Sequence, residues 1–219
     1  MKCSILIPTL GRAYVLLRLI HSVRFATPVG RYEMIFVVDA DDENTHRVLH
    51  AVPEGDVRIV VSDGTYPEKT NAGYRASEGE LILPTADDVR FYQDWYWHAL
   101  IEFQAGADVV GTNDLSPATE GGENVTMPII RRAYIEDPGC VYADPGIVFH
   151  EGYHHNFVET EVWEFAVHRG VARFARDSII EHLHPDWGKR ELDATDEKGM
   201  RSGWEEDQAL FHERSTAWT

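Results

Sequence analysis

Two adjacent carboxylates, Asp87 and Asp88, follow the apolar run Leu81–Leu83. If that run is a buried strand, both acids lie at its carboxyl end, where open α/β sheets bind their ligands. Neighbouring acids repel each other and lose hydration there, so a cation is expected to offset their charge. A hard divalent ion that also binds a phosphate would do so. The alternative is a solvated turn in which one acid caps a helix near Tyr92.

Two further acids, Asp39 and Asp63, stand directly after two other apolar runs. The carboxyl ends of parallel strands meet at one edge of a sheet, so these acids would join the first pair where doubly wound folds bind nucleotides. Each acid alone is more typical of a turn or a helix cap. The chain contains neither GxxxxGK[ST] nor GxGxxG, so P-loop and dinucleotide-binding sites have no support.

A second acidic pair, Glu159 and Glu161, stands at the start of a predicted helix. A carboxylate there could take a proton from a substrate as a general base. The structural alternative is ordinary, because acids in a first helical turn interact favourably with the helix dipole.

Two histidines, His182 and His184, follow a strand-like run. Alternation along a strand places both imidazoles on one face, where they could converge on one ion. The alternatives are a buried or backbone-bonded role, or a zinc site that adds His154 and His155. The absence of HExxH and the wide separation of the two cysteines argue against zinc.

The first half of the chain alternates apolar runs with helical patterns. Strands are expected at 4–8, 33–38, 57–61 and 81–83, and helices at 13–24, 45–50 and 70–77. This order predicts an α/β fold with a Rossmann-like, mostly parallel sheet flanked by helices. The strands lack polar alternation, which indicates burial on both faces.

The second half is less regular. It predicts a helix at 92–105, a strand at 107–111, a strand–helix junction or short helix at 129–136, a helix at 160–168 ended by Gly170, an antiparallel pair at 171–175 and 178–182, and a final helix at 204–213. The chain is predicted to be one domain of 219 residues, with a nucleotide-binding half (about 1–110), a catalytic and acceptor half (about 111–190) and a mobile tail with a terminal helix (191–219).

Composition limits the partners. A formal net charge of −17 opposes non-specific binding to nucleic acid or anionic membranes. No apolar run approaches the ~18 residues of a membrane span. The two cysteines, Cys3 and Cys140, form no redox or metal pattern, and no signal-peptide pattern is seen. These features favour a cytoplasmic protein.

The ordered motifs resemble those of family-2-type glycosyltransferases of the GT-A fold, over residues 3 to 185. The resemblance is carried by Ser4–Arg12, Val37–Asp42, Asn71–Gly73, Ala76–Leu81 and Thr85–Asp88. Thr85 departs from the fuller pattern, because an extra Asp often stands there. The resemblance therefore implies Mn²⁺ or Mg²⁺ on Asp88, with Asp87 contacting ribose or metal, and a small antiparallel portion on the acceptor side.

Further roles are implied by the same resemblance. Asp39 would accept from the base of the nucleoside. Glu159 lies eleven residues before Gly170, which matches the family's general base, with Glu161 second. A histidine of the 182/184 pair would join Asp88 on the metal. The implied nucleotide-sugar contacts are Pro8, Thr9, Arg12, Asp39, Asp63, Asn71, Arg75 and Asp87, and the acceptor contacts are Tyr153, His155 and Trp187.

The implied activity is metal-dependent, inverting transfer of a sugar from a nucleotide diphosphate sugar, a UDP-sugar first, to an acceptor hydroxyl. A hexosyl- or N-acetylhexosaminyl-transferase is expected. The alternatives are a nucleotidyltransferase on a similar sheet and a non-catalytic nucleotide-sugar- or glycan-binding module. The acceptor stays open among a glycan, a lipid-linked sugar, a protein and a modified DNA base. DNA would need a local basic strip, for which Arg131–Arg132 or Lys189–Arg190 is the candidate.

Overall fold

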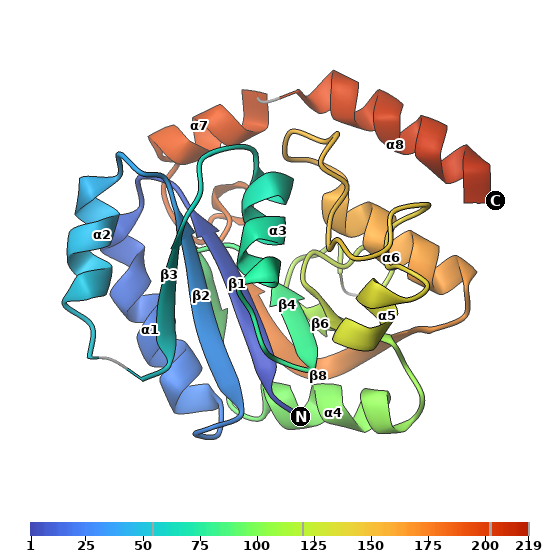
Figure 1. Ribbon diagram of the computed structural model, residues 1–219, viewed down its shortest axis with the longest axis horizontal. Coiled ribbons are helices and arrows are strands. Elements are labelled where there is room, and N and C mark those ends of the chain that lie inside the picture. Colours follow the sequence, from blue (N-terminus) through green and yellow to red (C-terminus); the bar gives the residue numbers. More distant parts are fainter. Residues whose placement is uncertain (54, 120, 202, 219) are drawn as a thin grey trace.

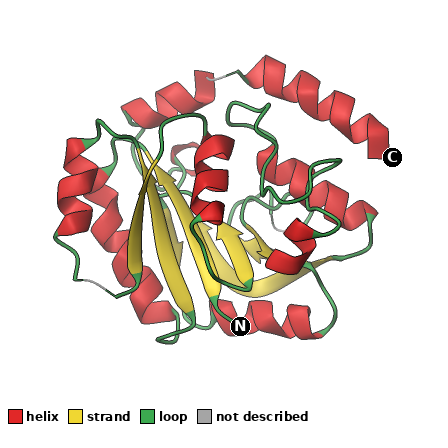
Figure 2. Ribbon diagram, in the orientation of Figure 1, coloured by secondary structure: helices red, strands yellow, loops and turns green. Residues whose placement is uncertain are grey.

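One mixed sheet organises the molecule (Figure 1). The computed structural model describes residues 1–53, 55–119, 121–201 and 203–218. The sheet has eight strands in the order β3-β2-β1-β4-β7-β6-β8-β5, with helices on both faces (Figure 2). Strands β1 to β4 are parallel, whereas β7 runs antiparallel to β4 and β6. The predicted parallel half and the antiparallel portion beyond it are both present.

The first half contains the predicted alternation of strands and helices. Its elements are β1 (Cys3–Thr9), α1 (Ala13–Ala26), β2 (Tyr32–Val38), α2 (Glu43–His50), β3 (Val57–Val61), α3 (Tyr66–Arg75) and β4 (Leu81–Pro84). Helix α3 begins four residues earlier than predicted. Thr65 and Glu68 form a capping box and Pro67 stands in the first turn, so the helix starts at Tyr66.

The second half departs further from the prediction. Its elements are β5 (Val89–Phe91), α4 (Trp95–Gln104), β6 (Val109–Asn113), β7 (Pro128–Arg131), α5 (Arg132–Glu136), α6 (Val158–His168), β8 (Ala172–His182), the 3₁₀ turn η1 (Pro185–Trp187), α7 (Ala194–Arg201) and α8 (Trp204–Trp218). The predicted antiparallel pair at 171–182 is wrong. It is one continuous strand, β8, which pairs with β6 and with the short β5.

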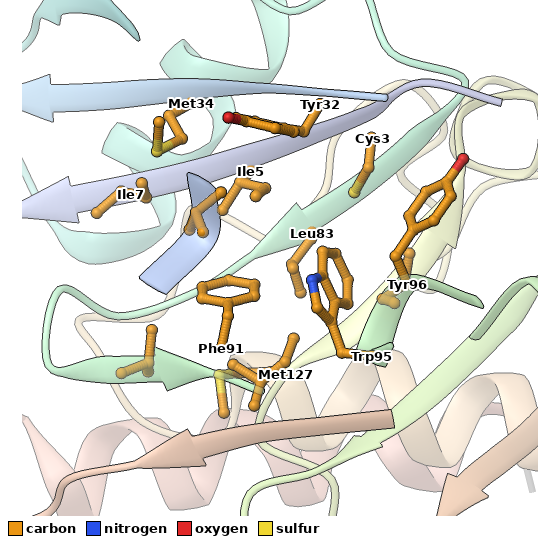
Figure 3. Packing of buried hydrophobic residues seen from close by; sticks show 14 of the residues in the cluster. Cys3, Ile5, Ile7, Tyr32, Met34, Leu83, Phe91, Trp95, Tyr96 and Met127 are labelled. Atoms are coloured by element: carbon orange, nitrogen blue, oxygen red, sulfur yellow. The ribbon is translucent and has the colours of Figure 1, made fainter. Parts of the chain in front are cut away.

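The core lies on both faces of the sheet. On one face, alternate residues of β1 and β2 pack against α1 and α4, and Trp95 and Phe91 lie edge to face with ring centroids 5.0 Å apart (Figure 3). On the other face, side chains such as Leu6 and Ile35 pack among α3, α5 and α6. Because both faces of these strands are buried, their apolar pattern is continuous, as expected from the sequence.

The C-terminal segment crosses the edge where the parallel strands end. Helices α7 and α8 lie above this edge, and α4 lies at the opposite end of the molecule (Figure 1). The sequence predicts one helix in this tail, and the structure has two. Residues 202 and 219 of the tail lie outside the described residues. No helix in the described part of the chain is long and apolar enough to cross a membrane.

Candidate active site

Asp87 and Asp88 are buried just beyond the end of β4. Asp87 accepts hydrogen bonds from Thr9 Oγ1 (2.7 Å) and Arg12 Nη1 (3.0 Å). Burial raises the pKa of Asp87 to about 6, against the opposing effect of Arg12. Burial would also raise the pKa of Asp88, but contacts with His182, Arg12 and Arg190 outweigh it and hold that pKa well below its usual range. The pair is therefore a compensated anionic centre, as the sequence predicts for the end of this strand.

The pairing of β5 with β8 brings His182 to Asp88, because Val89 lies opposite His182 in the register. His182 Nε2 and Asp88 Oδ1 are 3.2 Å apart, yet Asp88 Oδ1 makes no hydrogen bond. Neighbouring ligands of an octahedral Mg²⁺ or Mn²⁺ are about 3 Å apart, given metal–ligand distances of ~2.1 Å. These two atoms could hold one divalent ion, whose remaining ligands would come from phosphate and water.

The other histidines do not extend this site. The His184 ring is 5.2 Å from that of His182, and its Nδ1 accepts from the backbone of Asp186. His154 bonds Asp207 instead. Among the described residues, no three His, Cys, Asp or Glu side chains are arranged to hold a metal. The four-histidine zinc alternative is therefore not supported, and Asp88 with His182 is the pair that fits a metal.

Besides Arg12, a second arginine, Arg190, forms an ion pair with Asp88. Its Nη2 is 2.6 Å from Asp88 Oδ2, and it also pairs with Asp196. Asp196 in turn pairs with Arg12, whose Nε is 2.9 Å from Asp193 Oδ2. The segment 190–196 is thus tied to the first strand's loop by charge. Of the side chains named for a basic strip, Arg190 is engaged here, and Arg131 and Arg132 donate to backbone carbonyls.

The first of two adjoining cavities has a volume of about 370 Å³. It is lined by Pro8, Thr9, Leu10, Arg12, Gly64, Thr65, Tyr66, Glu68, Lys69, Ala86, Asp87, His154, His155 and Thr195. Lys69, a buried residue of this lining, places its Nζ 2.8 Å from Asp39 Oδ1, and Asp63 accepts from the backbone N–H of Ala40. Lys69 belongs to the first part of α3, which lies outside the helix expected at 70–77. The early start of α3 turns this side chain toward the sheet edge.

The second cavity, of about 490 Å³, contains the metal-fitting pair and Glu159. Glu159 Oε1 accepts from Tyr66 Oη at 2.9 Å, and removal from water raises the pKa of Glu159 to about 7. A carboxylate with this pKa is suited to general-base work near neutral pH. His155, which packs 5.2 Å from the Tyr66 ring, lines both cavities.

Glu161 does not face either cavity. It is fully buried and accepts two hydrogen bonds from Arg214, at 2.8 and 2.9 Å, and one from Tyr153 Oη at 2.8 Å. Both Glu161 and Tyr153 therefore have structural roles, because their polar atoms are consumed inside the protein. Of the two glutamates, Glu159 is the one that lines a cavity.

Other expected contacts lie outside the two cavities. The Asn71 side chain is buried and bonds the backbone of Val148 and Phe149. Arg75 is exposed and pairs with Glu151 at 3.7 Å. Trp187 packs against His182 and His184 without lining either cavity. Tyr66, Asp196 and Trp204, which do line them, carry no local sequence signal for the site.

The comparisons agree with this geometry. The family model for glycosyl transferase family 2 matches residues 4–158. No curated protein matches the sequence. The structure is similar to S. aureus TarS 1-349 in complex with UDP-GlcNAc (TM-score 0.69, 16% identity, 88% of this chain and 60% of that one). It is also similar to the mannosyltransferase PcManGT from Pyrobaculum calidifontis in complex with GDP-Man and Mn²⁺ (TM-score 0.67, 15% identity, 86% and 58%).

This chain therefore spans about three fifths of the length of those structures. At such low identity the likeness concerns the fold, which is that of GT-A glycosyltransferases. The family model covers most of the chain and confirms the resemblance seen in the motifs. This chain belongs to glycosyl transferase family 2.

Proposed function

We propose that this protein is a metal-dependent, inverting glycosyltransferase that moves a sugar from a nucleotide diphosphate sugar to an acceptor hydroxyl. One observation carries the proposal. The two cavities adjoin, sharing Arg12, Tyr66, Ala86, His155 and Thr195, and the second holds the metal-fitting pair together with a carboxylate of raised pKa. The first cavity would bind the nucleotide, and the second would hold the acceptor.

The residues suggest a single displacement. Glu159 takes the proton of the acceptor hydroxyl, whose oxygen attacks the anomeric carbon as the bond to the diphosphate breaks. Asp88 and His182 would hold Mn²⁺ or Mg²⁺, which would supply positive charge beside the departing diphosphate. Tyr66 orients the carboxylate by donating to Oε1. Inversion is proposed because Glu159 is placed to act as base, while Glu161 is committed to Arg214.

A nucleotide sugar is the donor that best suits the first cavity. The related structures were obtained with UDP, UDP-GlcNAc and GDP-Man, which supports this class of donor. Our first candidate is a UDP-sugar that carries a hexosyl or N-acetylhexosaminyl group. The acidic edge formed by Asp39 and Asp63 lies behind this cavity, where Asp39 would accept from the base once Lys69 shifts.

Thermal-shift measurements with UDP, GDP, CDP and TDP, each with and without Mn²⁺, test the donor site. We expect one nucleotide to stabilise the wild type only with metal, by about 2.7 kcal/mol at a hundred times its Kd. Asp88→Asn should abolish the metal-dependent part of the shift. The control Asp94→Asn changes an acid that lines neither cavity. The proposal fails if no nucleotide shifts the wild type under any condition.

A further inference from the structure

The lining of the second cavity includes an aromatic side chain for which the proposed donor site has no role. Trp204, the first residue of α8, lines this cavity and keeps 52% of its surface exposed. Its ring centroid lies 5.0 Å from that of Phe157, with the two planes tilted by 54°. A tryptophan combines a broad apolar face with a polar N–H, which suits a ligand with both kinds of surface. The ring is therefore placed to receive a ligand.

Neutral polar groups complete the lining. Asn124 and Thr126, in the loop before β7, and Thr160, on α6, all line the same cavity. Amides and hydroxyls both donate and accept hydrogen bonds. This combination complements a ring that carries several hydroxyl groups, because each hydroxyl is also both donor and acceptor.

Outside the metal-fitting pair, the charges around the cavity disfavour an anionic acceptor. Asp88, Glu159, Asp186 and Asp196 line it, and the one Lys or Arg side chain among the described lining residues is Arg12. Arg12 is already paired with Asp87, Asp193 and Asp196. A phosphorylated acceptor, whether DNA or a lipid phosphate, needs unpaired cations that this wall does not offer.

We infer that the second cavity binds a neutral sugar ring of the acceptor, stacked on Trp204, with one hydroxyl directed to Glu159. This inference rests on the proposed function and names its acceptor as carbohydrate. Trp204 takes the aromatic role for which the sequence suggests Trp187.

The test measures acceptor binding without donor. The wild type is applied to an array of neutral oligosaccharides, anionic oligosaccharides and single-stranded oligonucleotides, and the strongest neutral ligand is then titrated by calorimetry. We expect selective binding of neutral glycans and about a tenfold loss of affinity in Trp204→Ala. Trp204→Phe should keep most of the affinity. Trp97→Ala is the matched control, because Trp97 is 45% exposed on α4, at the far end of the molecule (Figure 1).

Each result decides the question. The inference is overturned if no neutral glycan binds, if anionic probes bind better, or if Trp204→Ala binds as the wild type does. Nucleotide thermal shifts on the same variants separate it from the proposed function, because Trp204 lies outside the first cavity. If glycan binding is absent while the nucleotide still shifts the melting temperature, only the inference about the acceptor fails. If glycans bind but no nucleotide shifts the melting temperature, only the proposed donor site fails.

Discussion

Two glutamates, two positions apart on α6, illustrate how partners decide the role of a residue. Glu161 is saturated by Arg214 and Tyr153 inside the protein, whereas Glu159 meets the cavity and a single tyrosine. From the sequence the two are nearly equivalent, since both stand in the first turn of a helix. Their side chains point to different surroundings because successive positions on a helix face different directions.

Glu159→Gln should lower kcat by roughly 10²- to 10⁴-fold, because the acceptor proton loses its base. In the wild type, kcat/KM should rise with pH through about 7, where the carboxyl of Glu159 ionises, and then level off. The variant should lose this rise. Steady-state kinetics between pH 5 and 9 check it, with Glu164→Gln as control, an exposed acid on the same helix. An unchanged pH profile in the variant would place the base elsewhere.

At the scale of elements, the ties between the C-terminal segment and the site are ionic. Arg190 occupies Asp88 Oδ2, the oxygen beside the one that fits a metal. Arg190→Gln should therefore tighten Mn²⁺ binding, by about tenfold or ~1.4 kcal/mol, because the metal no longer competes with a guanidinium. Titration followed by electron paramagnetic resonance measures the affinity directly. The control is Arg90→Gln, which removes an exposed arginine paired with Glu181. Weaker Mn²⁺ binding in Arg190→Gln would contradict the competition.

Helix α8 also holds the loop that leads into α6. Asp207 is buried and accepts from the backbone N–H groups of His154, His155 and Asn156. Asp207→Ala should lower the free energy of unfolding by about 2 kcal/mol, because these donors lose their acceptor. It should also reduce kcat, since Glu159 follows that loop directly. Urea unfolding and kinetics check both effects, and Glu205→Ala, in the exposed first turn of α8, is the control. Equal stability of the two variants would refute the bracing role.

At the scale of the whole molecule, the ionised carboxylate of Glu159 lowers the free energy of unfolding at the pH where it can act as a base. The pKa of Glu159 is about 7 in the folded state, above the ~4.3 of an unfolded chain. A carboxyl with a raised pKa binds its proton more tightly when folded, so its contribution to stability falls as pH rises from about 4 to about 7. Glu159→Gln should therefore be more stable than the wild type at pH 8, with a smaller difference at pH 4. Urea titrations at both values test this, and an equal difference at both would refute it.

The sequence predicts the sheet of the first half well, because β1, β2 and β4 are buried on both faces and each carries an unbroken apolar run. It does not predict β8 as one strand, since Arg176 and Asp177 interrupt the pattern at its centre, nor β5, which has only three residues. The acids at the strand ends follow from topology. Arg190 and Asp196 do not, because an ion pair between distant segments leaves no periodic trace.

The segment that carries Arg190 and Asp196 has a consequence for biosynthesis. A ribosome produces Asp88 102 residues before its partner Arg190, and Arg12 184 residues before its partner Asp196. Until Arg190 is added, Arg12 is the one arginine that the structure pairs with these two buried carboxylates at the end of β4. A nascent chain at that stage would hold this edge of the sheet open and hydrated. The site would close only when translation delivers the second guanidinium, so that a prematurely terminated product would lack it.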